Sequence, residues 1–283
     1  MRLLRVIPVP LMIAIAQFVV TAPPVLAGSV VYLPAAANNV GLFGSQFRTR
    51  VSIFVSSPAR PIILNVAAAT PAGLLPPTSV VIPDYAGSYS SENILEDLFH
   101  YAGAAALSFT LDPLSSPATF IVRAEVYTDG PCGEMSTSVP VLTSEYAIPP
   151  PVNPTFGQYN TSQSIGVRSD SEHRVNVACS NFSSNPVSVD AYIYTGSVLE
   201  GYHRFPLSPG QWSQAAVDRT WTPDGSGPPV LSDGIVRFSA FPAQGLPVAA
   251  NIGPVFCYAV VVVNASNDGT LVPGAPGAAY LIR

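Results

Sequence analysis

Short runs in which apolar and polar residues alternate, each bounded by turn residues, fill most of the chain. In the segment 174–180, Val175, Val177 and Cys179 alternate with more polar or smaller residues. In a β-strand, successive side chains point to opposite faces, so a period of two puts the apolar residues on one face. Six or seven such segments fall in each half of the chain, which is the number in a β-sandwich. The pattern therefore predicts an all-β fold.

One segment has the period of a helix instead. Four residues form one apolar face at helical spacing: Ile94, Leu95, Leu98 and Phe99. Ser91 can cap the start, Glu92 suits the first turn, and Gly103 follows the end. We expect one short helix that closes an end of the first sandwich.

The strand pattern of the first half recurs in the second half. Five residues return 124 positions later: Arg50, Val51, Ser52, Ile53 and Ser56 correspond to Arg174, Val175, Asn176, Val177 and Ser180. Pro61 pairs with Pro186 at an offset of 125, and Phe109 pairs with Phe238 at 129. An offset that drifts only between strands indicates a duplicated fold with different loops.

A proline-rich segment separates the two halves. Residues 147–154 read Ala-Ile-Pro-Pro-Pro-Val-Asn-Pro, a composition typical of a stiff, extended connector. We therefore predict a first sandwich at 28–146, a connector at 147–163 and a second sandwich at 164–283.

The first 27 residues have the features of a secretory signal peptide. Arg2 and Arg5 precede an apolar stretch at 6–20, and the segment ends in Val25-Leu26-Ala27 before Gly28. The apolar stretch is too short and too interrupted by proline to suit a membrane span. We expect a secreted, periplasmic or cell-surface protein that does not span the membrane once the leader is removed.

The charge of the chain excludes several classes of function. All twelve basic residues are arginine, and loss of the leader leaves ten against 17 acidic residues, a net charge of about −7 (10 − 17). An acidic chain gains nothing from phosphate contacts, so nucleic acid is not an expected partner. The lack of lysine excludes Schiff-base, Ser-Lys and P-loop mechanisms.

The repeated strands resemble those of a group of exported bacterial proteins with tandem immunoglobulin-like β-sandwich modules. In that group each module carries an Arg-Thr-Asn/Asp-Leu strand, here matched by residues 47–53 and 174–177. The segment 258–268 is similar to the closing strand and loop of these modules. This chain differs in having Ser52 at the Asn/Asp position and Phe47 where a tryptophan is usual. The resemblance implies a fold and export, but no defined activity.

No catalytic, metal or cofactor site is expected. The three histidines, His100, His173 and His203, are scattered, and no metal-ligand or nucleophile motif surrounds them. Glu96 and Asp97 are adjacent, so on a helix they point to different faces and make a poor acid–base pair.

The cysteines suggest one disulfide. Cys179 is on the inward face of its strand, and Cys257 lies in an apolar run at 255–263, so we predict a bond between them in an exported protein. Cys132 would be free or paired elsewhere. The order Cys179, Trp212, Cys257 is similar to that of immunoglobulin domains.

Arg50 and Arg174 are conserved between the two halves of the repeat and lie on the polar faces of their strands. We predict a structural role for both, in which each caps a loop carbonyl or pairs with a carboxylate.

The aromatic residues of the second half are the candidate ligand-binding residues. Trp212 and Trp221 are the only tryptophans, and Tyr192 and Tyr194 are on a nearby strand. If exposed, such rings stack on sugars or anchor protein partners; otherwise they fill the core. We predict an exported, non-enzymatic binding or structural module. The alternative is a secreted carbohydrate- or peptide-binding protein, or an accessory module of a hydrolase, that uses this aromatic loop.

Overall fold

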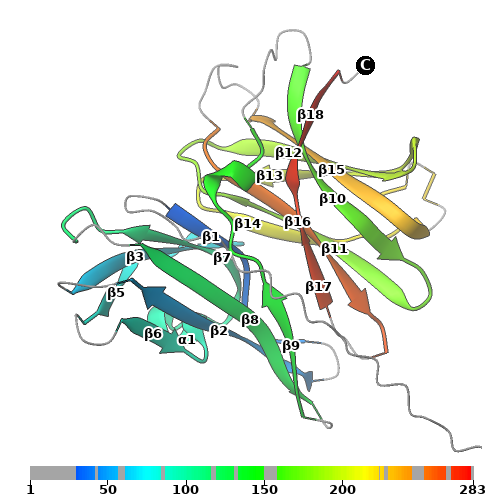
Figure 1. The fold of residues 1–283 in the computed structure, drawn as a ribbon. Coiled ribbons are helices and arrows are strands. Elements are labelled where there is room, and N and C mark those ends of the chain that lie inside the picture. The colour runs from blue at the N-terminus through cyan, green and yellow to red at the C-terminus, as the bar shows by residue number, and fades with distance from the viewer. Residues whose placement is uncertain are drawn as a thin grey trace, which may run out of the picture.

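The computed structural model describes residues 30–41, 44–56, 61–83, 87–115, 119–130, 133–149, 158–222, 224–225, 229–243, 252–265 and 269–281. Within these ranges the chain forms two antiparallel β-sandwiches beside each other (Figure 1), so the predicted all-β fold is confirmed. In the described part of the chain each sandwich has nine strands rather than six or seven. The predicted signal peptide lies outside the described residues. In the described part of the chain, no helix has both the length and the apolar character needed to cross a bilayer.

Module 1 contains nine strands and one α-helix. The strands are β1 (Val30–Val40), β2 (Gln46–Val55), β3 (Ile62–Thr70), β4 (Gly73–Leu74), β5 (Thr78–Ile82), β6 (Ser88–Ser91), β7 (Gly103–Leu111), β8 (Phe120–Gly130) and β9 (Gly133–Val139). One layer has the order β5-β3-β7-β1 and the other has β6-β2-β8-β9. The two layers join at a corner where Asn38 pairs with Arg48.

Module 2 contains the other nine strands. These are β10 (Gln158–Ser169), β11 (His173–Asn181), β12 (Val187–Thr195), β13 (Val198–Leu207), β14 (Trp212–Ala216), β15 (Leu231–Pro242), β16 (Val255–Val263), β17 (Gly269–Pro273) and β18 (Ala275–Leu281). They form a five-stranded sheet, β13-β12-β15-β10-β18, and a four-stranded sheet, β14-β11-β16-β17.

The two modules share one strand order. Strands β5-β3-β7-β1 correspond one by one to β13-β12-β15-β10, and β6-β2-β8-β9 correspond to β14-β11-β16-β17. The inward residues also correspond, since Val51 and Ile53 occupy the places of Val175 and Val177, and all four are fully buried. The duplication inferred from the sequence is therefore present in the topology.

The helix α1 (Ile94–Phe99) contributes to the core of module 1, as predicted. Ile94 and Leu95 are fully buried in it. The capping residue is Asn93 rather than Ser91. Ser91 instead donates its hydroxyl to the Asp97 carboxylate at 2.6 Å, a contact that ties the preceding strand to the helix.

The start of the connector contacts both modules. Strand β10 already begins at Gln158, inside the predicted connector of 147–163. Ile148 is buried in the core of module 2, where its amide donates to the Val255 carbonyl at 2.8 Å. Leu142 and Tyr32 exchange two backbone hydrogen bonds of 2.8 Å. These contacts anchor residues 142–148 to both modules, while residues 150–157 lie outside the described ranges.

The two sandwiches pack against each other through an apolar interface. Module 1 contributes the outward face of β3, β7 and β1, and module 2 contributes the outward face of β14, β11 and β16 (Figure 1). The buried residues are Tyr32, Ala69, Ala106 and Leu142 on one side and Ala178, Trp212, Phe256 and Tyr258 on the other. The molecule is therefore a stack of four β-layers, in which one outward face at each end remains uncovered by the other module.

Candidate functional site

Both tryptophans are buried, so the second of the two possibilities left open by the sequence applies: Trp212 and Trp221 do not form an exposed binding loop. Trp212 is 6% exposed and lies between the modules, where its indole N–H donates to the Tyr258 hydroxyl at 3.1 Å. Trp221 is 2% exposed and donates to the Ala216 carbonyl at 2.9 Å. Its ring stacks on His203 with centroids 4.8 Å apart. Sequence alternation could not show this, because the burial of Trp221 depends on how its loop folds back and the burial of Trp212 depends on contact with module 1.

The predicted bond between Cys179 and Cys257 is present. The two cysteines face each other on the neighbouring strands β11 and β16 of one sheet, unlike the bond between sheets of an immunoglobulin domain. Trp212 pairs with Ser180 on the opposite face of that sheet, so it does not pack on the disulfide. Cys132 lies outside the described residues.

Tyr192 and Tyr194 lie on the uncovered face of the five-stranded sheet. Both project from β12 to the side opposite the buried Ile193, and both are partly exposed. Tyr202, which is 36% exposed, lies beside Tyr192 on β13, with ring centroids 5.2 Å apart. The tyrosines are therefore brought together without the tryptophans.

Three rows of side chains cross this face from strand to strand. The first contains Leu199, Tyr194, Ile235 and Ile165; the second contains Tyr202, Tyr192, Arg237 and Gln163; the third contains Arg204, Asp190, Ser239 and Thr161. We call these three rows the tyrosine–arginine face. Ile165 is 62% exposed and Leu199 is 46% exposed, so the first row offers apolar surface to solvent.

Asp190 holds the charged and aromatic groups of this face in position. Its carboxylate accepts hydrogen bonds from the Tyr192 hydroxyl at 3.2 Å and the Tyr202 hydroxyl at 2.9 Å. The guanidinium of Arg204 donates to the same carboxylate through Nε at 2.6 Å and Nη2 at 2.8 Å. Asp190 is 3% exposed, so four bonds compensate for its desolvation. The network fixes two rings and one guanidinium in a single arrangement.

The ionisation of these groups follows from the same contacts. Burial, and then the Asp190 charge, raise the pKa of the Tyr192 hydroxyl above its ordinary value. Burial and the hydrogen bond to Asp190 raise the pKa of Tyr202 as well. The hydrogen bonds to Asp190 raise the pKa of Arg204 further. Both tyrosines are neutral donors at neutral pH, and the arginine remains a cation.

Cation–π contacts complete the face. The guanidinium of Arg237 lies 4.8 Å from the centroid of Tyr194, and that of Arg204 lies 5.5 Å from Phe241. Sequence analysis missed Asp190, Arg204 and Arg237. The period-two series Asp190, Tyr192, Tyr194 was a usable signal, since it places all three on one side of a strand.

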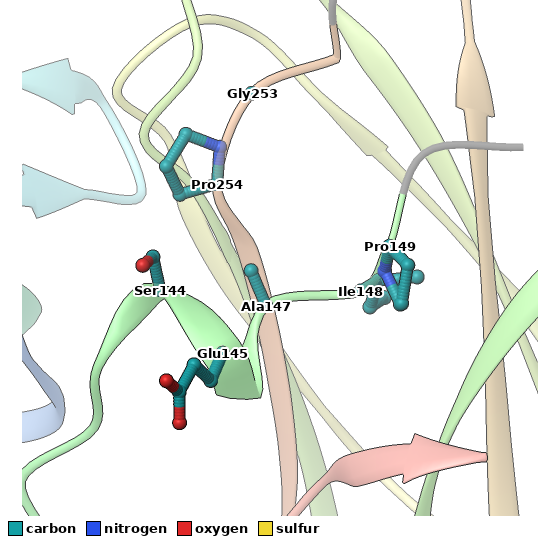
Figure 2. Close-up of a pocket in the computed structure, with 7 residues that line it drawn as sticks. All are labelled: Ser144, Glu145, Ala147, Ile148, Pro149, Gly253 and Pro254. Atoms are coloured by element: carbon teal, nitrogen blue, oxygen red, sulfur yellow. The ribbon is translucent and has the colours of Figure 1, made fainter.

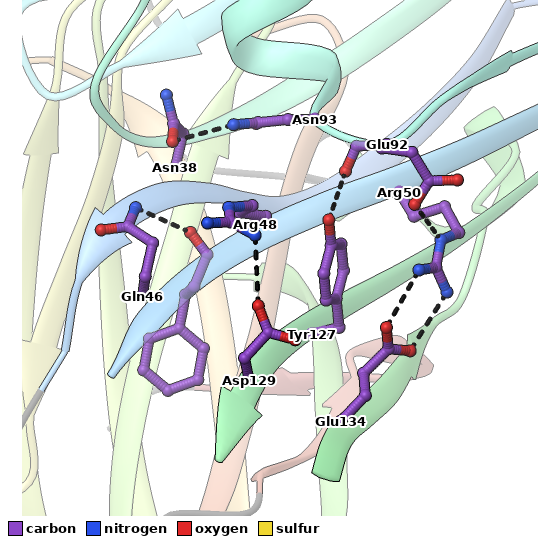
Figure 3. Close-up of polar contacts among 10 residues, drawn as sticks. Asn38, Gln46, Arg48, Arg50, Glu92, Asn93, Tyr127, Asp129 and Glu134 are labelled. Atoms are coloured by element: carbon purple, nitrogen blue, oxygen red, sulfur yellow. Dashed lines mark hydrogen bonds and ion pairs between the residues drawn. The ribbon is translucent and has the colours of Figure 1, made fainter. Parts of the chain in front are cut away.

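The outward face at the other end of the molecule is charged. Arg50 of β2 donates to Glu92 at 2.7 Å and to both oxygens of Glu134 at 3.2 and 3.1 Å (Figure 3). It also lies 3.6 Å from Glu125. Its guanidinium covers the Tyr127 ring at 4.6 Å. The predicted carboxylate pairing of Arg50 is therefore present. Because these groups are exposed, the ion pairs contribute little to stability.

Arg174 has a different kind of partner. Its Nη1 donates to the side-chain oxygen of Asn264 at 3.1 Å. The Asn264 side chain donates in turn to the Ser171 carbonyl at 3.1 Å. Arg174 thus helps to hold the ends of β11 and β16 together, a structural role that differs from that of Arg50.

The remaining titratable groups do not assemble a catalytic or metal site in the described residues. No group of three His, Cys, Asp or Glu side chains there could hold a metal ion. His173 contacts Asp170 at 2.8 Å within a turn, and this bond lowers the pKa of the Asp170 carboxyl. Asp97 is engaged by Ser91, and Glu96 accepts a bond from the Asn38 amide at 3.2 Å.

A shallow hollow of about 390 Å³ lies where the connector meets module 2. Its lining consists of Ser144, Glu145, Ala147, Ile148, Pro149, Gly253 and Pro254. Figure 2 shows the Glu145 carboxylate pointing away from Pro149 and Pro254, so the space between them is lined by apolar groups. It lacks the convergent polar groups of a small-molecule site.

Comparison with known proteins assigns no family. No protein-family model and no curated protein matches the chain. Among solved structures, the chain is similar to an α-L-rhamnosidase of Streptomyces avermitilis complexed with L-rhamnose, with a TM-score of 0.24 and 11% identity. The match covers 92% of this chain and 29% of the enzyme chain. A likeness this weak carries no argument about function.

Proposed function

We propose that this chain is an exported, non-enzymatic binding or structural module of the periplasm or cell surface, and that the tyrosine–arginine face is its binding surface. The signal-peptide pattern of residues 1–27 supports export. The single observation that carries the proposal is the composition of the face, where tyrosine, arginine and exposed apolar residues meet on the outward side of one sheet.

Such a composition is typical of the energetic centre of a binding interface. Tyrosine and arginine are enriched among the residues that contribute most to protein association. The Asp190 network also fixes Tyr192, Tyr202 and Arg204 before a ligand arrives, which reduces the entropy lost on binding. The carboxylate itself is buried beneath four hydrogen bonds, so it is poorly placed to act as a general base.

A saccharide ligand is the second candidate function. Three tyrosine rings on one face, Tyr192, Tyr194 and Tyr202, favour it, because aromatic rings stack on the apolar faces of sugars. This candidate keeps the carbohydrate-binding hypothesis but moves it from the loop of Trp221 to the sheet.

Pull-down of the purified protein with isolated cell envelopes, and separately with a panel of insoluble polysaccharides, tests both candidates. We expect Tyr194→Ala and Tyr202→Ala to weaken binding about tenfold or more. Tyr146→Ala is the matched control, because Tyr146 is 40% exposed and lies outside the face. Retention on envelopes alone favours a protein partner, and retention on polysaccharide favours a saccharide. Binding that is unchanged in both face variants would refute the proposal.

A further inference from the structure

We infer that the tyrosine–arginine face receives module 1 of a second copy of this chain, so that copies join head to tail. This inference rests on the proposed function, because it names the partner of the same face. It comes from comparing the interface that the chain uses internally with the two faces that it leaves uncovered.

The internal interface joins two different surfaces. One is the outward face of β3, β7 and β1 in module 1, and the other is the outward face of β14, β11 and β16 in module 2. Since the modules share one strand order, each of these faces has an equivalent in the other module. The equivalents are the uncovered faces at the two ends of the stack. A contact between unlike surfaces always leaves one surface of each kind free.

On module 2, apolar residues occupy the positions that form the internal interface in module 1. Ala69 of β3 pairs with Ala106 of β7, and both residues are buried between the modules. At the repeat offsets of 125 and 129, the corresponding register pair in module 2 is Tyr194 opposite Ile235. Two residues of the exposed apolar row therefore stand where module 1 makes its contact.

Module 1 shows the same relation on its uncovered face. In module 2, Ala178 of β11 pairs with Tyr258 of β16 at the centre of the internal interface. The corresponding pair in module 1 is Phe54 of β2 opposite Ile121 of β8. Phe54 is 47% exposed, and the guanidinium of Arg123 lies 5.9 Å from its ring centroid. Repetition of the internal contact between copies would bury Phe54 and Ile121 against Tyr194 and Ile235.

The charges on the two faces are opposite in sign. On the uncovered face of module 1, three arginines and four carboxylates leave a net charge of −1 (3 − 4): Arg48, Arg50 and Arg123 against Glu92, Glu125, Asp129 and Glu134. On the tyrosine–arginine face, Arg204 and Arg237 with Asp190 leave a net charge of +1 (2 − 1). Opposite charges favour encounter in one orientation, and salt weakens their attraction. The association should therefore weaken as ionic strength rises.

Sedimentation velocity of the full mature chain over a wide concentration range tests the inference. A contact between unlike surfaces that does not close gives an open series, so we expect species larger than a dimer to grow with concentration. Phe54→Glu blocks one face and Tyr194→Glu blocks the other, and each variant alone should be monomeric. An equimolar mixture of the two should form a dimer and nothing larger, because each partner supplies one intact face.

Ile165→Glu serves as a second variant of the module 2 face, since Ile165 is 62% exposed and its replacement does not disturb the core. Circular dichroism establishes that each variant is folded. A wild-type chain that remains monomeric, or a mixture that does not restore the dimer, would overturn the inference. If envelope or polysaccharide binding persists in that case and is lost in Tyr202→Ala, the proposed function stands without it. If no binding of any kind occurs, both fail.

Discussion

The two modules share a strand order but differ in what their outward residues do. Where module 2 has Cys179 opposite Cys257, module 1 has Val55 opposite Phe120, and all four are buried. Inward positions thus change only between residues that fill a core. Outward positions change in kind, as from Ala69 in module 1 to Tyr194 in module 2. A duplicated fold constrains the inside and leaves the outside free to acquire function.

The polar centre of the two equivalent faces shows the same difference. In module 1, Ser79 donates to the side-chain oxygen of Asn65 at 2.8 Å. The corresponding cross-strand pair in module 2 is Arg204 and Asp190. A neutral hydrogen bond has been replaced by a charged, two-point one, which orients two tyrosines as well. This exchange marks the module 2 face as the more specialised one.

Replacement of Trp221 should have the largest effect on stability. Trp221→Ala leaves a cavity in the core of module 2 and should lower the free energy of unfolding by about 3–5 kcal/mol. Urea denaturation measures this, with Tyr146→Ala as a surface control. A loss of binding without a loss of stability would mean that Trp221 contacts the ligand and does not fill the core.

Loss of the disulfide should cost somewhat less. The bond joins residues 78 positions apart, and its removal in Cys179→Ala/Cys257→Ala should lower stability by about 2–4 kcal/mol. Thermal unfolding with and without a reductant measures the effect. The reductant should destabilise the wild-type chain and leave the double variant unchanged; equal sensitivity in both would contradict the assignment.

Replacement of Asp190 by asparagine, which resembles the Asn65 of module 1, should have a smaller effect on stability. Asp190→Asn makes the position resemble Asn65 and weakens the charged bonds from Arg204, at a cost of about 1–3 kcal/mol. Unfolding in urea gives the stability, and the pull-down assay gives the binding. We expect binding to fall more than in Tyr146→Ala, because the two tyrosine rings lose their common anchor.

The smallest expected effect is a pH dependence due to His203. Burial beside Trp221 lowers the pKa of His203, and the nearby Asp218 partly opposes this. The folded state thus favours the neutral ring, and stability is lost as pH falls below the unfolded value of 6.5, where the unfolded chain takes up the proton first. The free energy of unfolding, measured across this pH range, should depend less on pH in His203→Gln than in the wild-type chain. An unchanged slope would show that other groups dominate.

Several features of the fold followed from local patterns. Alternation predicted the strands around Val175 and Val177, and helical spacing predicted the helix that begins at Ile94. Both patterns arise because one face of the element is buried and the other is exposed to solvent. The pairing of Cys179 with Cys257 followed from the inward direction of one residue and the apolar surroundings of the other. These inferences needed no knowledge of contacts distant in the sequence.

The binding surface did not follow in this way. The sequence indicated Tyr192 and Tyr194 only as neighbours of the two tryptophans, and the fold buries both tryptophans. The residues that organise the face, Asp190 and Arg204, come from two strands whose register fixes their contact, and register depends on the whole sheet.

The amino-acid sequence by itself determined the all-β class, the duplication and the inward residues, because these depend on periodicity and on offsets within one chain. Only the tertiary structure decided which outward faces meet and which remain open. Ala178 and Phe54 stand at equivalent places on the equivalent strands β11 and β2, yet Ala178 is fully buried and Phe54 is 47% exposed. The difference arises because stacking of two sheets covers one copy of each face and leaves the other uncovered.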